Sequence, residues 1–192
     1  MKKILIILFL SFSVFQLFGQ CKYIKWKIKT MPQKGRYKYE CPDSVDYMSK
    51  NYNFFEKGAN HWYKAAIAKS GDEYFFRLQF AKPYSVHFMI NEDNPIIIQF
   101  ENGETLKLFP ACNFKGYGLI VYNMCAFYNI TKEQLKKLTM SPVERFSYYV
   151  TSEKKIETAQ KSDEGWFFDF EIKSKKRRKN CMEAAKCMLA KQ

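Results

Sequence analysis

The sequence predicts an α+β protein in which a curved antiparallel sheet of about seven to nine strands carries a C-terminal amphipathic helix packed on one face. Apolar and polar residues alternate with a period of two through most of the central body, and turn residues separate the alternating segments. The connections are short, which favours antiparallel pairing because parallel strands need long crossovers. From about residue 175 the apolar residues change to a helical spacing.

The first hairpin is expected over residues 62–80, where WYKAAIA is followed by the turn SGD and then by EYFFRLQF. Further strands are expected at SVHFMI, PIIIQF and TLKLF, with NEDNP and ENGE as the turns between them. The strand EYFFRLQF places one set of side chains on an apolar face and the other set on a polar face. The first set is Tyr74, Phe76, Leu78 and Phe80, and the second is Glu73, Arg77 and Gln79.

Two later segments are also expected to be strands. LIVYNMCAFYNI, residues 119–130, is apolar on both faces, so it is the candidate for a central buried strand. GWFFDFEIK returns to strict alternation between the two faces of a sheet. Its inward side chains are expected to be Trp166, Phe168, Phe170 and Ile172, and its outward ones Asp169 and Glu171.

Two helices are predicted. TKEQLKKL opens with Thr131 and has Gln134 three residues later, which is the capping-box spacing, so a short helix is expected near 132–138. The second helix is expected over about residues 175–190 and is amphipathic. Its apolar stripe consists of Cys181, Ala184, Ala185 and Met188, flanked by Met182 and Leu189.

The N-terminus has the layout of a secretory signal peptide, with two lysines, an apolar stretch and then Gly19. The apolar stretch is shorter than the roughly 20 residues that span a bilayer. We therefore expect a signal peptide at 1–19 and an exported protein, periplasmic or secreted, with lipid anchoring through Cys21 as the alternative. Residues 20–192 would form a single globular domain: a basic segment at 20–40, a sheet body at about 62–172 and the C-terminal helix.

The positive charge is concentrated at the two ends of the chain, which has a net charge of +13. In YIKWKIK the lysines alternate with apolar residues, and KKRRK begins the C-terminal helix. We expect these segments to form one cationic patch for an anionic partner such as lipid headgroups, acidic glycan or another protein. The alternative is that the charges only keep the helix solvated; nucleic acid fits the expected compartment less well. The patch residues are Lys25, Lys27, Lys29, Lys175, Lys176, Arg177, Arg178 and Lys179.

The sequence contains little that indicates catalysis. The two histidines, His61 and His87, have no partners at metal-ligand spacing, and there is no C-x-x-C, G-x-S-x-G, phosphate loop or H-E-x-x-H. No cofactor is expected. Cys112 or Cys125 with His87 forms the one conceivable nucleophile and base, and the alternative places His87 on an exposed strand face.

The six cysteines favour at least one disulfide after export, although the sequence leaves the pairing open. One pair is excluded. Six helical residues separate the Cα atoms of Cys181 and Cys187 by roughly 9 Å, and a disulfide tolerates at most about 7 Å.

The order of segments resembles that of small exported proteins of Gram-negative gut bacteria, a group with no assigned activity. The resemblance covers roughly residues 62–190, and its landmarks are GDEYFFRLQF, ITKEQLKKL and the terminal helix. It implies export and this fold, and it carries over no functional residue.

Three classes of function remain. The favoured one is a non-enzymatic binding or interaction module of the cell envelope. The alternatives are an enzyme whose site is assembled from scattered residues and a structural component of an envelope assembly, which a large exposed apolar patch would favour.

Overall fold

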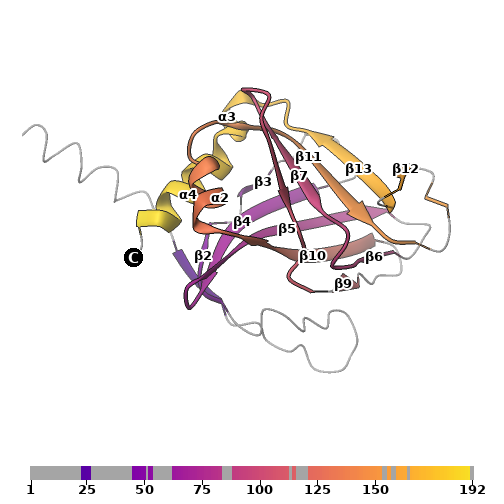
Figure 1. Ribbon diagram of the computed structural model, residues 1–192, viewed down its shortest axis with the longest axis horizontal. Coiled ribbons are helices and arrows are strands. Elements are labelled where there is room, and N and C mark those ends of the chain that lie inside the picture. The colour runs from indigo at the N-terminus through magenta and orange to yellow at the C-terminus, as the bar shows by residue number, and fades with distance from the viewer. Residues whose placement is uncertain are drawn as a thin grey trace, which may run out of the picture.

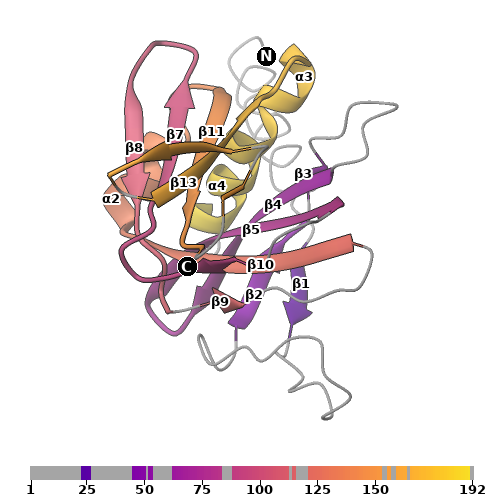
Figure 2. The same ribbon diagram turned by 90° about the vertical axis from the view of Figure 1, so that its right-hand side faces the viewer.

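The computed structural model describes residues 23–26, 45–50, 52–53, 62–83, 88–112, 114–115, 121–152, 155–156, 159–163 and 165–190. Two large antiparallel sheets face each other, and helices from the end of the chain lie along one side of them (Figures 1 and 2). The protein is therefore α+β with mostly antiparallel strands and a C-terminal helix, as the alternation of the sequence predicts.

The strands form three sheets. The first contains β1 (Tyr23–Trp26), β2 (Val45–Ser49), β4 (Trp62–Ser70), β5 (Glu73–Pro83) and β10 (Val121–Ile130) in that order, and β3 (Tyr52–Asn53) also pairs with β4. The second has the order β12 (Gln160–Ser162), β13 (Gly165–Glu171), β11 (Val143–Val150), β7 (Ile96–Phe100) and β8 (Thr105–Leu108). The third pairs β6 (Met89–Ile90) with β9 (Phe114–Lys115).

The expected single curved sheet of about seven to nine strands is wrong in number and arrangement, because the described residues hold thirteen strands in three sheets. The longest strand that the alternation does not locate is β11, the middle strand of the second sheet. Its register shifts between Val143 and Arg145, so its inward residues Val143 and Phe146 are three apart instead of two. This β-bulge removes the alternation by which strands such as β5 and β13 were recognised.

The strand β10 lies at the end of the first sheet's order, yet it is buried on both faces as predicted. A bridge between Pro110 and Tyr128 connects it to the chain that leaves β8. The amide of Ala111 donates to the carbonyl of Phe127 (2.8 Å), and the amide of Asn129 donates to that of Phe109 (2.9 Å). The two large sheets are thus joined along β10, and this junction gives the strand its central position.

Aromatic side chains fill the space between the two sheets. The ring centroid of Tyr148 lies 4.6 Å from that of Phe80 and 5.1 Å from that of Phe168. The hydroxyls of Tyr63 and Tyr148 are 3.5 Å apart, and burial raises the pKa of Tyr63 to about 12. Burial also raises the pKa of Tyr128, whose hydroxyl is fully buried and has no hydrogen-bond partner among the described residues. Both sheets therefore contribute large rings to one continuous core.

The face of β5 that was expected to be polar and outward is exposed at Glu73, as predicted, but buried at Arg77. Arg77 lies on it and is only 5% exposed. Its Nε donates to Sγ of Cys125 (3.0 Å), and its Nη2 donates to Oε1 of Gln79 (2.7 Å). A buried guanidinium needs such acceptors because its donors are otherwise unsatisfied away from water.

The short helix α2 (Lys132–Lys137) has the predicted capping box. The amide of Gln134 donates to Oγ1 of Thr131 (3.2 Å), and Oε1 of Gln134 accepts from the amide of Thr131 (2.8 Å). The C-terminal helix is divided at Lys179 into α3 (Lys175–Arg178) and α4 (Asn180–Ala190). No helix within the described residues is long and apolar enough to cross a bilayer.

The apolar stripe of α4 is buried as predicted, with Cys181, Ala184, Ala185 and Met188 all enclosed. The helix contacts β4 and β2 of the first sheet and also β11 of the second. It therefore packs against strands of both sheets, rather than on one face of a single sheet.

The cysteines differ in state. Cys187 is disulfide-bonded, whereas Cys112, Cys125 and Cys181 take part in no disulfide. Cys181 therefore forms no bridge with Cys187, in agreement with the helical spacing. Residues 1–22, with the expected signal peptide and Cys21, lie outside the described residues, as do Lys27, Lys29, His61 and His87.

Candidate functional site

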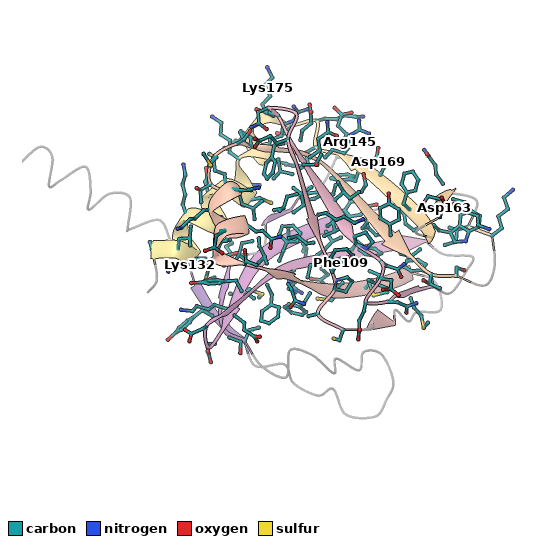
Figure 3. All side chains as sticks on the ribbon, viewed as in Figure 1. Phe109, Lys132, Arg145, Asp163, Asp169 and Lys175 are labelled. Carbon is teal, nitrogen blue, oxygen red and sulfur yellow. The ribbon has the colours of Figure 1, made fainter. Side chains whose placement is uncertain are left out.

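The basic run at the end of the chain forms α3 and the turn after it. After β13 the chain passes Ile172, whose amide donates to the carbonyl of Glu144 (2.8 Å), and then enters α3. Lys175, Lys176 and Lys179 are exposed, and Arg177 is half-buried. The helix lies at the top of the molecule in the view of Figure 1, and Figure 3 shows Lys175 extending outward there.

Arg178 differs from its neighbours because it is directed at the second sheet. Its side chain is only 12% exposed. The Nη1 atom lies 2.9 Å from Glu144 and 3.2 Å from Glu101, and Nη2 lies 3.4 Å from Glu171. The Nε atom donates to the carbonyl of Ile172 (2.6 Å). A guanidinium presents its donors in a planar fork, so one arginine can serve three carboxylates and a carbonyl at once.

The three glutamates around Arg178 come from separate parts of the second sheet. Glu101 lies in the turn after β7, Glu144 in β11 and Glu171 at the end of β13. Their strands are adjacent in the sheet, which brings the three carboxylates to the same end. We call this arrangement the Arg178 cluster: Arg178 with Glu101, Glu144 and Glu171. It attaches the start of the C-terminal helical segment to the sheet.

The remaining cations of the run do not share these carboxylates. Within the part of the chain that the structure describes, no ion pair involves the four residues of what we call the α3 cations: Lys175, Lys176, Arg177 and Lys179. A hollow of about 420 Å³ lies beside them and is lined by Lys175, Lys179, Arg178, Glu101 and Glu144. Arg178 supplies one positive charge against three carboxylates, a net charge of −2, so the four α3 cations outweigh the cluster and the two groups together carry a net charge of +2.

Of the other half of the expected patch, only Lys25 belongs to the described residues; Lys27 and Lys29 lie outside them. Lys25 belongs to β1, the end strand of the first sheet, and only its backbone is described. Figures 1 and 2 both place α3 at the top of the molecule and β1 in its lower half. Among the described residues, the cationic surface at α3 is therefore separate from the backbone of β1.

A second charged group lies on the outer face of β11 and β13. Arg145 pairs with Asp169, and Oγ of Ser147 donates to Oδ1 of Asp169 (2.8 Å). Glu171 lies 3.8 Å from Arg145. Figure 3 shows Arg145 and Asp169 side by side. These side chains satisfy one another across neighbouring strands, so the group joins β11 to β13 and offers no unpaired charge to a ligand.

Little in the described residues resembles a catalytic centre. They contain no group of three or more His, Cys, Asp and Glu side chains placed to hold a metal ion. Of the two candidate nucleophiles, Cys125 is buried beside Arg77 and Cys112 is half-buried. Comparison with protein-family models and with curated proteins gives no match to this chain.

Proposed function

We propose that this protein is an exported, single-domain binding module of the cell envelope, and that the α3 cations are its contact with an anionic partner. The proposed partner is an anionic surface such as lipid headgroups, acidic glycan or an acidic protein. The leader-like N-terminus supports export, and the positive charge at the chain ends supports an anionic partner.

The proposal rests on the difference in ion pairing between Arg178 and the other residues of the basic run. Arg178 engages three carboxylates, while the α3 cations beside it have no ion pair within the described residues. A solvated helix face of mixed charge would keep the cations balanced by nearby acids. Here four cations without an ion pair lie on one short segment that the Arg178 cluster holds in place, and they exceed the net charge of −2 of that cluster by two.

The expected strength is moderate. A Lys or Arg near an anionic membrane surface contributes about 1 kcal/mol, and salt screens the attraction over a Debye length of about 10 Å at 0.1 M ionic strength. Four such residues give about 4 kcal/mol, which corresponds to a Kd of about 1 mM and weakens as salt is added. The binding is reversible and needs no cavity.

The test is a quadruple variant in which Lys175, Lys176, Arg177 and Lys179 are each replaced by Gln while Arg178 is retained. Wild type should bind vesicles that contain anionic phospholipid, fail to bind neutral vesicles, and lose binding as salt rises. The variant should melt at the wild-type temperature and lose most of its binding.

A matched control replaces Lys132, Lys136 and Lys137 of α2 by Gln, because these are also exposed helical lysines. This control should bind anionic vesicles as wild type does. Equal binding by wild type and the quadruple variant, or binding that ignores salt, would show that the α3 cations only keep the helix solvated.

Export is tested separately by N-terminal sequencing of the protein recovered outside the cytoplasm. The expected first residue is at or near Gln20. An intact Met1 on the recovered protein would contradict the proposed leader.

A further inference from the structure

A hollow of about 880 Å³ opens where the two large sheets diverge. Its walls are the end of β8, the end of β10 with the start of α2, and the turn between β4 and β5. The sheets meet at the hydrogen bond from the amide of Asn129 to the carbonyl of Phe109. Since β8 pairs with β7 and β10 pairs with β5, the two chains separate beyond this bond and leave the hollow between them.

An aromatic ring is exposed in this hollow. Phe109 is 48% exposed, and among the described residues the one other exposed large apolar side chain is Met140, which does not line the hollow. A single exposed apolar residue is ordinary on a flat surface. In a concave site with polar groups around it, an exposed ring is the feature by which such sites contact the apolar face of a ligand.

Charged groups of both signs surround the ring. Lys69, Lys107 and Lys132 reach the hollow from three different elements. The Nζ atom of Lys107 lies 5.5 Å from the ring centroid of Phe109, so an ammonium group and the ring are adjacent. Asp72, in the turn between β4 and β5, and Glu73, the first residue of β5, contribute carboxylates.

Neutral polar side chains complete the lining. Asn129 and Gln134 supply amides, and Thr131 supplies a hydroxyl. The capping box fixes the orientation of Gln134, because its Oε1 already accepts from the amide of Thr131. Its amide NH₂ group has two donors of its own.

We propose that this hollow binds a short oligosaccharide that carries carboxylate groups. Sugar hydroxyls both donate and accept, so they suit a lining that mixes amides, carboxylates and ammonium groups. The apolar face of a sugar ring can pack on Phe109, and its carboxylates can pair with the lysines. The carboxylates of Asp72 and Glu73 disfavour a densely charged polyanion such as nucleic acid.

This site is separate from the α3 cations. Figure 3 shows Lys175 at the top of the view, and Lys132 and Phe109 lower down. The proposal for the hollow can therefore be tested independently of the proposal for the α3 cations. Variants of one surface serve as controls for the other.

The test is titration of the full protein with tetragalacturonate, with maltotetraose as a neutral tetrasaccharide of the same length. Wild type should bind tetragalacturonate saturably and about tenfold or more tighter than maltotetraose. Phe109→Ala should weaken binding about tenfold, and Lys107→Gln and Lys132→Gln should each weaken it several-fold and reduce its salt dependence.

Two controls should bind as wild type does: Met140→Ala, which removes the other exposed apolar side chain, and the α3 quadruple variant. Phe109 is half exposed, so its truncation should leave the melting temperature nearly unchanged. Absence of tetragalacturonate binding, or equal loss in Phe109→Ala and Met140→Ala, would overturn the proposal. Tighter binding of tetraglutamate than of tetragalacturonate would overturn it too, since the hollow would then be a peptide site.

Discussion

The guanidinium of Arg178 lies 2.9 Å from the carboxylate of Glu144, which ties the start of the C-terminal helical segment to the middle strand of the second sheet. Arg177, its neighbour in the sequence, has no ion pair within the described residues. The run KKRRK therefore contains two kinds of residue. One holds the segment in place, and the α3 cations remain available to a partner.

Replacing Arg178 by Gln should destabilise the protein by about 1–2 kcal/mol, because Glu101, Glu144 and Glu171 would repel one another without their common partner. The estimate is modest because the glutamates are partly exposed and water screens them. Arg177→Gln is the matched control and should change the free energy of unfolding by less than about 0.5 kcal/mol. Urea unfolding measures the free energy of unfolding of both variants. Equal effects of the two substitutions would contradict the structural role of Arg178.

Replacing Tyr128 by Phe should leave the protein equally stable or stabilise it by up to about 1 kcal/mol. The hydroxyl of Tyr128 is buried without a partner among the described residues, so its removal relieves an uncompensated desolvation cost. The same change at Tyr148 removes a hydroxyl that lies 3.5 Å from that of Tyr63, and it should destabilise by about 0.5–1.5 kcal/mol. Calorimetry of both variants measures the sign of each change in stability. A large loss of stability in Tyr128→Phe would show that the hydroxyl of Tyr128 has a partner.

Replacing Gly165 by Ala should destabilise by about 2 kcal/mol or more. Gly165 has φ +120°, and an added Cβ would lie 2.7 Å from the carbonyl oxygen of Val150. That oxygen belongs to the backbone of β11, so it cannot move aside easily. Gly103→Ala is the control: its φ of +84° is also strained for Ala, but a Cβ there meets nothing within 4 Å. Thermal unfolding should give Gly103→Ala a higher melting temperature than Gly165→Ala. The reverse order would contradict the close approach of Gly165 to the carbonyl oxygen of Val150.

The protein should lose stability at alkaline pH. Burial raises the pKa of Tyr63 from 10.0 to about 12 and that of Cys181 from 9.0 to about 12. Both groups bind their protons more tightly when folded, so their contribution is fully present below about pH 9 and is lost as the pH rises toward 12. Tyrosinate absorbance and circular dichroism, followed together from pH 8 to 12, should show a set of tyrosines that ionise only as the fold is lost. Complete tyrosine ionisation near pH 10 with the fold intact would contradict this burial.

Much of the fold could be predicted wherever a local pattern sets the structure. The hairpin turn at Gly71, the capping box of Thr131 and Gln134, and the buried stripe of α4 follow from residues near one another in the sequence. The outward position of Asp169 and Glu171 was also correct. In each case a few adjacent side chains decide the outcome, so alternation and spacing are sufficient evidence.

The rest depends on contacts between distant segments. Arg77 appeared to face solvent because its strand alternates, yet Cys125 from β10 covers it. The Arg178 cluster needs glutamates from three parts of the chain, and no spacing in the sequence brings them together. The hollow at Phe109 likewise exists only because two sheets diverge there. The sequence located the basic run but could not separate Arg178 from the α3 cations.

The account is tested most directly by measuring how Arg177→Gln and Arg178→Gln bind anionic vesicles at low salt, at a temperature where both variants remain folded. We expect Arg177→Gln to weaken binding several-fold with an unchanged melting temperature, and Arg178→Gln to lower the melting temperature while it weakens binding less than Arg177→Gln does. If Arg178→Gln loses as much binding as Arg177→Gln, or if neither loses any, then the basic run is not divided as proposed and the α3 cations are not the binding surface.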